Sequence, residues 1–309
     1  MRDSQQTLMA AELAVSTAHQ LGEGVVWDAA RRMWLWTDIE ASLLMRWAGD
    51  SRAPERHALP DRLGCLAPTR SGRLLLGLAK GLAWGRVNAD GLVVTPLVAV
   101  DAAEPRTRIN DGRTDRSGHF VFGTFNEAAD RRPIGSFYQY STRYGLRRLA
   151  LPAVTIANSI CFSPDGGTMY FADSPCGLIQ QCDYDAERAE VGPVRPFARL
   201  LAPGGPDGSV VDEEGCLWNA QWGLSQVQRY APSGEMLERV GLPVPHVSCL
   251  AFGGPDLSTL LITTARVGLS PLQLADVPLS GALFSIHWPH CRGLVDVPFD
   301  DDLGTLTSA

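Results

Sequence analysis

Short apolar runs alternate with polar turns along this chain, and the same arrangement occurs six times. In each copy a β-prone run leads into a polar turn that usually contains glycine, and a second β-prone run follows. The paired runs are residues 24–28 and 33–36, 65–67 and 74–76, 112–115 and 119–122, 160–162 and 169–171, 210–212 and 216–218, and 249–252 and 260–262. Because such runs around a short polar turn are typical of a hairpin, each pair predicts two antiparallel strands. No segment shows a sustained helical period.

The spacing of the hairpins indicates how they are arranged. Their turns recur at Arg31, Ser71, Ser117, Asp165, Glu214 and Asp256, a period of about 40 to 50 residues, which is the length of a four-stranded propeller blade. Several hairpins are followed by a third β-prone run, as at 43–47, 136–140, 226–230 and 283–287. The sequence therefore predicts an all-β, six-bladed β-propeller with four-stranded blades.

The six repeats take up nearly the whole chain. We therefore expect residues 1–309 to form a single propeller domain, with frayed termini at 1–11 and 300–309. Residues 12–15 are a β-prone run outside the six hairpins, and in a propeller such a run can complete the last blade and close the ring. A β-sandwich or two unrelated β domains are the alternatives, because sandwich sequences can mimic a loose repeat.

Composition narrows the class of protein. The chain of 309 residues is 45% hydrophobic and 20% charged, which is ordinary for a soluble folded domain. Its net charge of −7 gives no basic footprint, so neither a nucleic acid nor a membrane surface is expected as a partner. The first residues are polar and no apolar run of signal or membrane-spanning length follows, so we expect a cytoplasmic protein. The seven scattered cysteines include no CxxC pair and are expected to be reduced thiols.

One position shared by the repeats lies just upstream of each first strand. It is occupied by Glu23, Leu63, Asn110, Asn158, Asp207 and Val247. The innermost strands of a propeller line its central channel, so four oxygen-bearing side chains are expected to converge at one mouth of that channel. Carboxylate and carboxamide oxygens favour one hard divalent cation such as calcium, magnesium or manganese, with zinc or ferrous iron also possible. The alternative for each residue is a turn former that bonds its own backbone.

Four segments carry a resemblance to a known family. Residues 21–28, 108–112, 157–166 and 206–208 resemble, in order, the motifs of the SMP-30/gluconolactonase/regucalcin family, and together they extend over nearly the whole chain. The resemblance implies a six-bladed propeller, a metal held by Glu23, Asn158 and Asp207, and hydrolysis of sugar lactones. It also implies that Arg108 and Asn110 contact the substrate.

The sequence differs from the family pattern at one position. Where regucalcin-type members carry a further substrate-contacting glutamate, an alignment without gaps places Ala128, and Asn126 and Glu127 lie beside it. We take Glu127 as the substrate-binding residue, with Asn126 as the alternative. The run 122–127 is more similar to the bacterial sugar-acid lactonases of the group than to the animal proteins.

The expected activity is opening of an aldonolactone of a pentose or hexose by a monomer or weak homodimer. A cation would polarise the lactone carbonyl, and Asp207 would act as general base toward the attacking water. Two other functions stay open. The chain could be a calcium-binding or regulatory propeller with a structural metal, or a phosphotriester hydrolase that uses the same site.

Aromatic residues near the strands give weaker signals. Trp34 and Trp36 alternate along one strand and are expected in the core. Trp222 follows a hairpin and could either wall a sugar pocket or pack in the core. His246 is expected to be a structural hydrogen-bonding residue.

Overall fold

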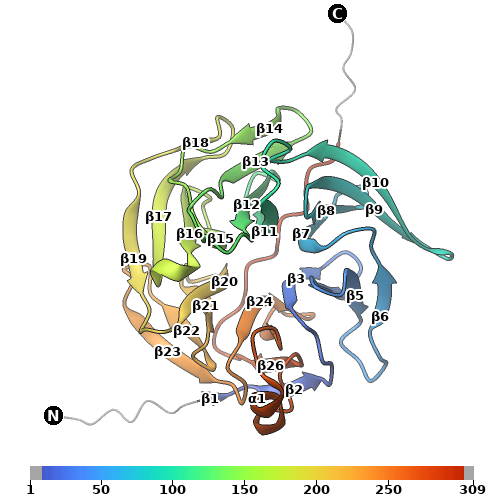
Figure 1. Cartoon of the computed structure of the whole chain (residues 1–309), viewed down its shortest axis with the longest axis vertical. Helices are drawn as coiled ribbons and strands as arrows, with labels where there is room; N and C mark the ends of the chain where they lie inside the picture. Colours follow the sequence, from blue (N-terminus) through green and yellow to red (C-terminus); the bar gives the residue numbers. More distant parts are fainter. Residues whose placement is uncertain (1–8, 303–309) are drawn as a thin grey trace, which may run out of the picture.

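The computed structural model describes residues 9–302 and confirms the six-bladed β-propeller with four-stranded blades (Figure 1). Blade 1 contains β3 (Gly22–Asp28), β4 (Met33–Asp38), β5 (Leu43–Trp47) and β6 (Glu55–Ala58). Blade 2 contains β7 (Leu63–Pro68), β8 (Leu74–Leu78), β9 (Gly81–Asn88) and β10 (Gly91–Ala99). Blade 3 contains β11 (Thr107–Thr114), β12 (Phe120–Asn126), β13 (Phe137–Ser141) and β14 (Gly145–Arg148).

The other three blades follow the same antiparallel order from the channel outward. Blade 4 contains β15 (Ala157–Phe162), β16 (Thr168–Asp173) and β17 (Leu178–Asp185), and both β18 (Glu190–Val191) and β19 (Arg195–Arg199) pair with β17. Blade 5 contains β20 (Gly205–Val211), β21 (Leu217–Trp222), β22 (Gln226–Tyr230) and β23 (Met236–Gly241). Blade 6 contains β24 (Val247–Gly253), β25 (Thr259–Thr264) and β26 (Leu283–His287). The short helices are η1 (Ser174–Cys176) and α1 (Pro271–Asp276). Within residues 9–302, no helix has the length and apolar character needed to cross a bilayer.

The ring is closed by the start of the chain. Strand β2 (Glu12–Val15) pairs antiparallel with β26 and supplies the fourth strand of blade 6, which confirms the role expected for residues 12–15. Strand β1 (Met9–Ala10) adds to the outer edge of blade 5, parallel to β23. Because the first strands of the chain complete sheets formed by its last third, the two ends of the ring are tied together by backbone hydrogen bonds.

The hydrophobic core consists of six clusters, and each one fills the space between two neighbouring blades. Successive residues of a strand face opposite sides of its sheet, so the inner strands supply apolar side chains to two clusters at once. Between blades 6 and 1, Trp34 and Trp36 pack against Leu261 and Leu283. Both tryptophans are buried, as expected from their alternation along β4.

Every innermost strand contains a β-bulge close to the position shared by the repeats. Pairing with the second strand of the blade is interrupted between Glu23 and Val26, Leu63 and Cys65, Ile109 and Gly112, Asn158 and Cys161, Pro206 and Ser209, and Val247 and Leu250. A bulge inserts unpaired residues and changes the direction in which nearby side chains point. The bulges therefore set which side chains at this end of each inner strand enter the channel.

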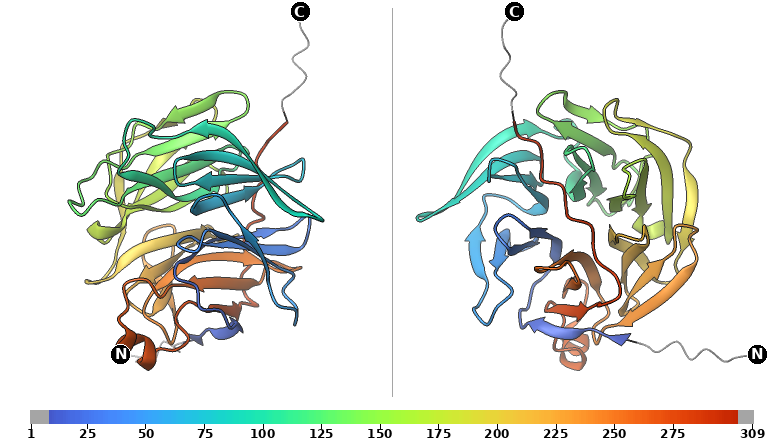
Figure 2. Two further views of the ribbon diagram at one scale, coloured as in Figure 1. Left: turned by 45° about the vertical axis from the view of Figure 1, so that its right-hand side comes forward. Right: turned by 180° about the vertical axis from the view of Figure 1, so that it is seen from behind.

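The C-terminal strap, residues 288–302, crosses the face at which the inner strands end (red in the right-hand view of Figure 2). On that face Asp296 accepts a hydrogen bond from Arg113 Nη1 at 2.8 Å. The fully buried ring of Phe299 stacks on Tyr140, with centroids 5.8 Å apart and planes at 16°. Because the strap covers this end of the propeller, the site is expected at the opposite end, where the inner strands begin.

Two segments expected to be frayed are ordered in part. Residues 9–11 contain β1 and continue its pairing, since Ala11 donates to the Gly241 carbonyl at 3.1 Å. Asp301 is buried and forms an ion pair with Arg73 at 2.9 Å. The remaining residues of the expected frayed ends, 1–8 and 303–309, lie outside the described residues.

Candidate metal and substrate site

A cavity of about 450 Å³ lies where the inner strands begin, and the four polar residues of the shared position all line it. Glu23, Asn110, Asn158 and Asp207 come from blades 1, 3, 4 and 5. The apolar members of the position, Leu63 and Val247, are fully buried in interblade clusters. The convergence predicted from the repeat is therefore present in the structure.

The register of these four residues differs from that assumed in the sequence alignment. Glu23 and Asn158 are the last paired residues before their bulges, whereas Asn110 and Asp207 follow the last paired residues and lie inside theirs. Since side chains of neighbouring residues in a regular strand point to opposite faces, only the bulges allow both kinds of position to face one cavity. The shared position therefore includes two kinds of residue, paired and unpaired, whose side chains face the same cavity because of the bulges.

Two side chains, one from blade 4 and one from blade 5, fix the main chain at Asp207. Its carbonyl accepts hydrogen bonds from Ser159 Oγ at 2.6 Å and from Asn219 Nδ2 at 3.2 Å. Ser159 adopts a left-handed conformation with φ of 60° within the bulge of β15. The hydrogen bond from Ser159 connects the bulges of blades 4 and 5, so it fixes the position of the Asp207 backbone relative to that of Asn158.

The two carboxylates of the site lie in the same cavity, with Asp207 buried and Glu23 half-buried. Burial raises the pKa of Glu23 to about 8, and the charge of nearby Asp111 adds to this effect. Burial raises the pKa of Asp207 well above its usual range, and the charge of Glu23 adds to it. Without a cation, the pair therefore retains a proton near neutral pH, because two neighbouring like charges repel.

A chain of hydrogen bonds fixes the amide groups of the site. Arg108 Nη1 donates to Asn110 Oδ1 at 2.7 Å, and Asn110 Nδ2 donates to Asn158 Oδ1 at 3.0 Å. Asn158 Nδ2 donates to Ser174 Oγ at 2.8 Å, and Ser174 Oγ donates to the Pro206 carbonyl at 2.8 Å. A carbonyl can only accept, so the Ser174 hydroxyl must point to Pro206 and accept from the NH₂ of Asn158. This orientation leaves Asn158 Oδ1 as the acceptor on the cavity side.

Arg108 reaches the cavity from a buried position, and Glu127 lies behind it. The Arg108 guanidinium stacks over the Phe125 ring at 4.9 Å, and its Nε donates to Glu127 Oε1 at 3.2 Å. Glu127 also accepts from Nη1 and Nη2 of Arg62 at 2.6 and 2.7 Å and is not among the residues that line the cavity. This position supports a role for Glu127 in holding Arg108 rather than in touching a ligand directly.

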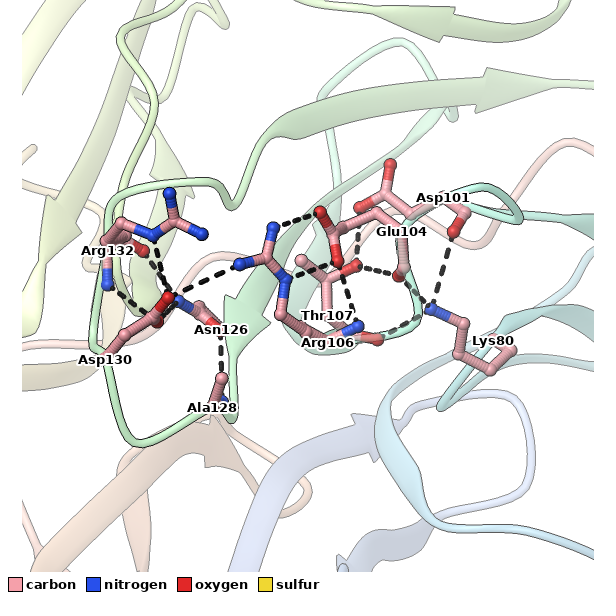
Figure 3. A network of polar contacts seen from close by, with 9 residues as sticks. All are labelled: Lys80, Asp101, Glu104, Arg106, Thr107, Asn126, Ala128, Asp130 and Arg132. Atoms are coloured by element: carbon pink, nitrogen blue, oxygen red, sulfur yellow. Dashed lines mark hydrogen bonds and ion pairs between the residues drawn. The ribbon is translucent and has the colours of Figure 1, made fainter.

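Asn126, the alternative to Glu127, is fully buried and also does not line the cavity. Its Nδ2 donates to Asp130 Oδ1 at 2.9 Å and to the Arg132 carbonyl at 2.8 Å (Figure 3). Its Oδ1 accepts from the Ala128 amide at 3.0 Å. Asn126 therefore shapes the loop that follows β12.

Several residues that line the cavity were not found by sequence reasoning. They include Glu40, Phe125, Arg131, Ser174 and Val267. These residues lie in or beside connections at the ends of the second strands, outside the shared position, so the repeat gives no signal for them. Trp222, left open between pocket wall and core, lines the cavity and stacks on His246 with ring centroids 4.1 Å apart.

The donors of the site fit a hard divalent cation. Glu23 and Asp207 offer carboxylate oxygens and Asn158 an amide oxygen, which are the ligands that calcium, magnesium and manganese prefer. A pair of carboxylates that retains a proton in the absence of metal is suited to exchange that proton for a cation.

A second acidic cluster is accounted for by an internal ion pair. In the described part of the chain, Asp212, Glu214 and Cys216 place their side-chain ligand atoms within 4.8 Å of one another. Arg229 Nη2 lies 2.8 Å from Asp212 Oδ2 and 2.5 Å from Glu214 Oε2. Because Arg229 already pairs with both carboxylates, this cluster is a weaker candidate for the cation than the cavity.

Comparison with known proteins places the chain in a family. The family model described as SMP-30/Gluconolactonase/LRE-like region matches residues 21–266. The chain is 46% identical over 283 residues to L-arabinolactonase of Azospirillum brasilense, covering 91% of this chain and 92% of the relative. It is 33% identical to 6-deoxy-6-sulfogluconolactonase of Pseudomonas putida, covering 88% and 93%. The structure matches regucalcin of Agrobacterium tumefaciens, described as a calcium-binding protein, with a TM-score of 0.87, 32% identity and coverage of 94% and 97%. The chain therefore belongs to the SMP-30/gluconolactonase/LRE-like family.

Proposed function

We propose that the chain is a metal-dependent hydrolase that opens an aldonolactone of a pentose or hexose to the aldonic acid. The observation that carries the proposal is the convergence of Glu23, Asn158 and Asp207 in one cavity with Arg108 and Asn110. Relatives named as sugar lactonases support the substrate class. The cavity of about 450 Å³ also lies within the range of about 300–1,000 Å³ that is usual for small-molecule sites.

In this proposal Glu23, Asn158 and Asp207 hold the cation. When bound, a divalent cation polarises the lactone carbonyl and offsets the negative charge that develops on its oxygen. Asn158 does not titrate, so it can only ligate and orient. Arg108 and Asn110 line the same cavity and present hydrogen-bonding groups to the hydroxyls of the sugar.

Asp207 is the proposed general base. Water attacks the carbonyl carbon while Asp207 accepts a proton from it, and the ring C–O bond then breaks. The released ring oxygen takes that proton back from Asp207, leaving an open-chain hydroxyl and a carboxylic acid. The Asp207 side chain lines the cavity, so its carboxylate can reach a water held there and accept its proton.

The test is a panel of pentono- and hexono-lactones followed by acid release, with calcium, magnesium, manganese and zinc supplied in turn. We expect turnover of at least one lactone above the rate without protein, and no turnover of a phosphotriester. Lactone rates equal to the protein-free control, together with tight calcium binding, would instead support a calcium-binding propeller. Turnover of the phosphotriester alone would support the other hydrolase.

A further inference from the structure

The loop of residues 127–132, which follows β12, places an arginine at the cavity. Arg131 lines the cavity, and its guanidinium lies over the Phe125 ring at 5.5 Å. Arg108 stacks over the same ring at 4.9 Å. Two guanidinium groups thus share one aromatic ring in the cavity wall, although cations repel each other in the absence of an anion.

The two arginines differ in what they already bind. Arg108 is committed to Glu127 and Asn110. Within residues 9–302, the guanidinium of Arg131 has neither an ion pair nor a hydrogen bond to another side chain, whereas its neighbour Arg132 is paired with Asp130 at 2.7 Å. The five N–H donors of Arg131 are therefore available to a ligand in the cavity.

The backbone around Arg131 is held in an unfavourable conformation. Its φ is 49°, in the left-handed region that side chains other than glycine rarely adopt. The Arg131 amide donates to the Ala128 carbonyl at 3.1 Å, and its carbonyl accepts from Thr155 Oγ1 at 3.1 Å. Asn126 Nδ2 holds the next carbonyl, that of Arg132, at 2.8 Å.

A second layer of contacts supports this loop, as Figure 3 shows. Arg106 bridges Asp130 of the loop, at 3.3 Å, and Glu104 of the preceding connection, at 2.6 Å. Lys80 Nζ in turn donates to the carbonyls of Glu104 and Thr107 at 2.8 and 2.7 Å. The polar residues of the region are thus paired with one another and keep the strained loop in place. Such strain in a well-supported loop is typical of functional sites.

We propose that Arg131 is a substrate-binding residue that determines specificity, an inference that rests on the proposed lactone hydrolysis at this site. The hydrogen-bonded chain from Asn158 through Asn110 reaches Arg108, and the Phe125 ring contacts both Arg108 and Arg131. Arg131 therefore meets the part of the substrate furthest from the reacting carbonyl. It donates to the oxygens of that exocyclic part, either paired hydroxyls or a carboxylate, which suit the planar fork of a guanidinium.

The test compares Arg131→Ala and Arg131→Lys with wild type, and Arg132→Ala serves as the control within the same loop. Loss of a charged hydrogen-bond donor typically raises KM by about tenfold. We expect this rise for Arg131→Ala with kcat nearly unchanged, partial recovery in Arg131→Lys, and a much smaller effect in Arg132→Ala. An unchanged KM in Arg131→Ala would overturn the proposal. An equal rise in Arg132→Ala would also overturn it, because disorder of the loop would then explain the effect.

Two substrates distinguish whether Arg131 binds hydroxyls or a carboxylate. If hydroxyls are bound, Arg131→Ala raises KM alike for a neutral hexonolactone and for glucaro-1,4-lactone, which carries a carboxylate. If a carboxylate is bound, the rise is several-fold larger for the second substrate.

Calorimetric binding of the aldonate product separates this proposal from the proposed function. Weaker binding to Arg131→Ala supports the role of Arg131 even if no lactone is hydrolysed. Normal lactone hydrolysis together with unchanged aldonate affinity overturns the role of Arg131 alone.

Discussion

Ser174 is predicted to control cation affinity without touching the cation. Replacing it with alanine removes the hydroxyl that accepts from Asn158 Nδ2 at 2.8 Å and donates to the Pro206 carbonyl at 2.8 Å. The amide of Asn158 then loses one of the two side-chain contacts that fix which of its ends faces the cavity, the other being the hydrogen bond that its Oδ1 accepts from Asn110 Nδ2 at 3.0 Å. Its oxygen and nitrogen can exchange places, and only the oxygen is a useful ligand.

The size of the effect follows from this loss of orientation. Removing a side chain that orients a ligand typically costs about 10–100-fold in metal affinity. This corresponds to about 1.4–2.7 kcal/mol of binding free energy. Folding loses stability separately, because the Asn158 amide and the Pro206 carbonyl are left without this partner, at a cost of about 1–3 kcal/mol for a buried polar group.

The assay is calorimetric titration of the chelated protein with calcium and with manganese, alongside thermal unfolding. Ser71→Ala is a matched control, since Ser71 bonds Asp301 beneath the C-terminal strap, at the other end of the propeller. Ser174→Ala is expected to weaken cation binding by at least tenfold, while Ser71→Ala lowers only the melting temperature. Wild-type cation affinity in Ser174→Ala would refute the orientation argument.

Two further predictions concern stability. Because the pKa of Glu23 is raised from its ordinary value of 4.5 to about 8, the folded metal-free protein binds more protons than the unfolded chain between these values. Its unfolding free energy should therefore fall as pH rises from 4.5 to about 8, which can be measured as the melting temperature of chelated protein. Glu23→Gln should show a smaller fall, and equal pH profiles of the two proteins would contradict the raised pKa of Glu23. Phe299→Ala should lower the unfolding free energy by about 3–5 kcal/mol in urea titrations, since its ring is fully buried against Tyr140 and Trp84. A loss below about 1 kcal/mol would show that the strap is not part of the core.

The sequence was sufficient to predict the fold because each hairpin repeats the same alternation. Even the closing strand could be found, since residues 12–15 are β-prone and belong to no hairpin. The sequence could not give the register of the site residues. Asn110 and Asp207 lie inside bulges, whereas Glu23 and Asn158 are paired residues that precede theirs. A bulge depends on the pairing with the next strand, and the spacing of residues along one strand does not record it.

Residues that support the site were harder to predict because their partners are distant in sequence. Glu127 was expected to bind the substrate, and the structure pairs it with Arg62, which lies 65 positions earlier. Ser174 and Arg131 belong to connections that differ from blade to blade, so no repeat exposes them. Their roles depend on contacts that only the folded chain creates.

The claim that Glu23, Asn158 and Asp207 hold a cation required for lactone opening is tested most directly by removing and restoring that cation. Hydrolysis of the best lactone of the panel is measured for wild type and Asp207→Asn, first after exhaustive chelation and then during titration with each divalent cation. We predict that chelated wild type is inactive and regains full activity with at least one cation, while Asp207→Asn stays inactive with a native melting profile. Full activity of the chelated wild type, or of Asp207→Asn, would contradict the account.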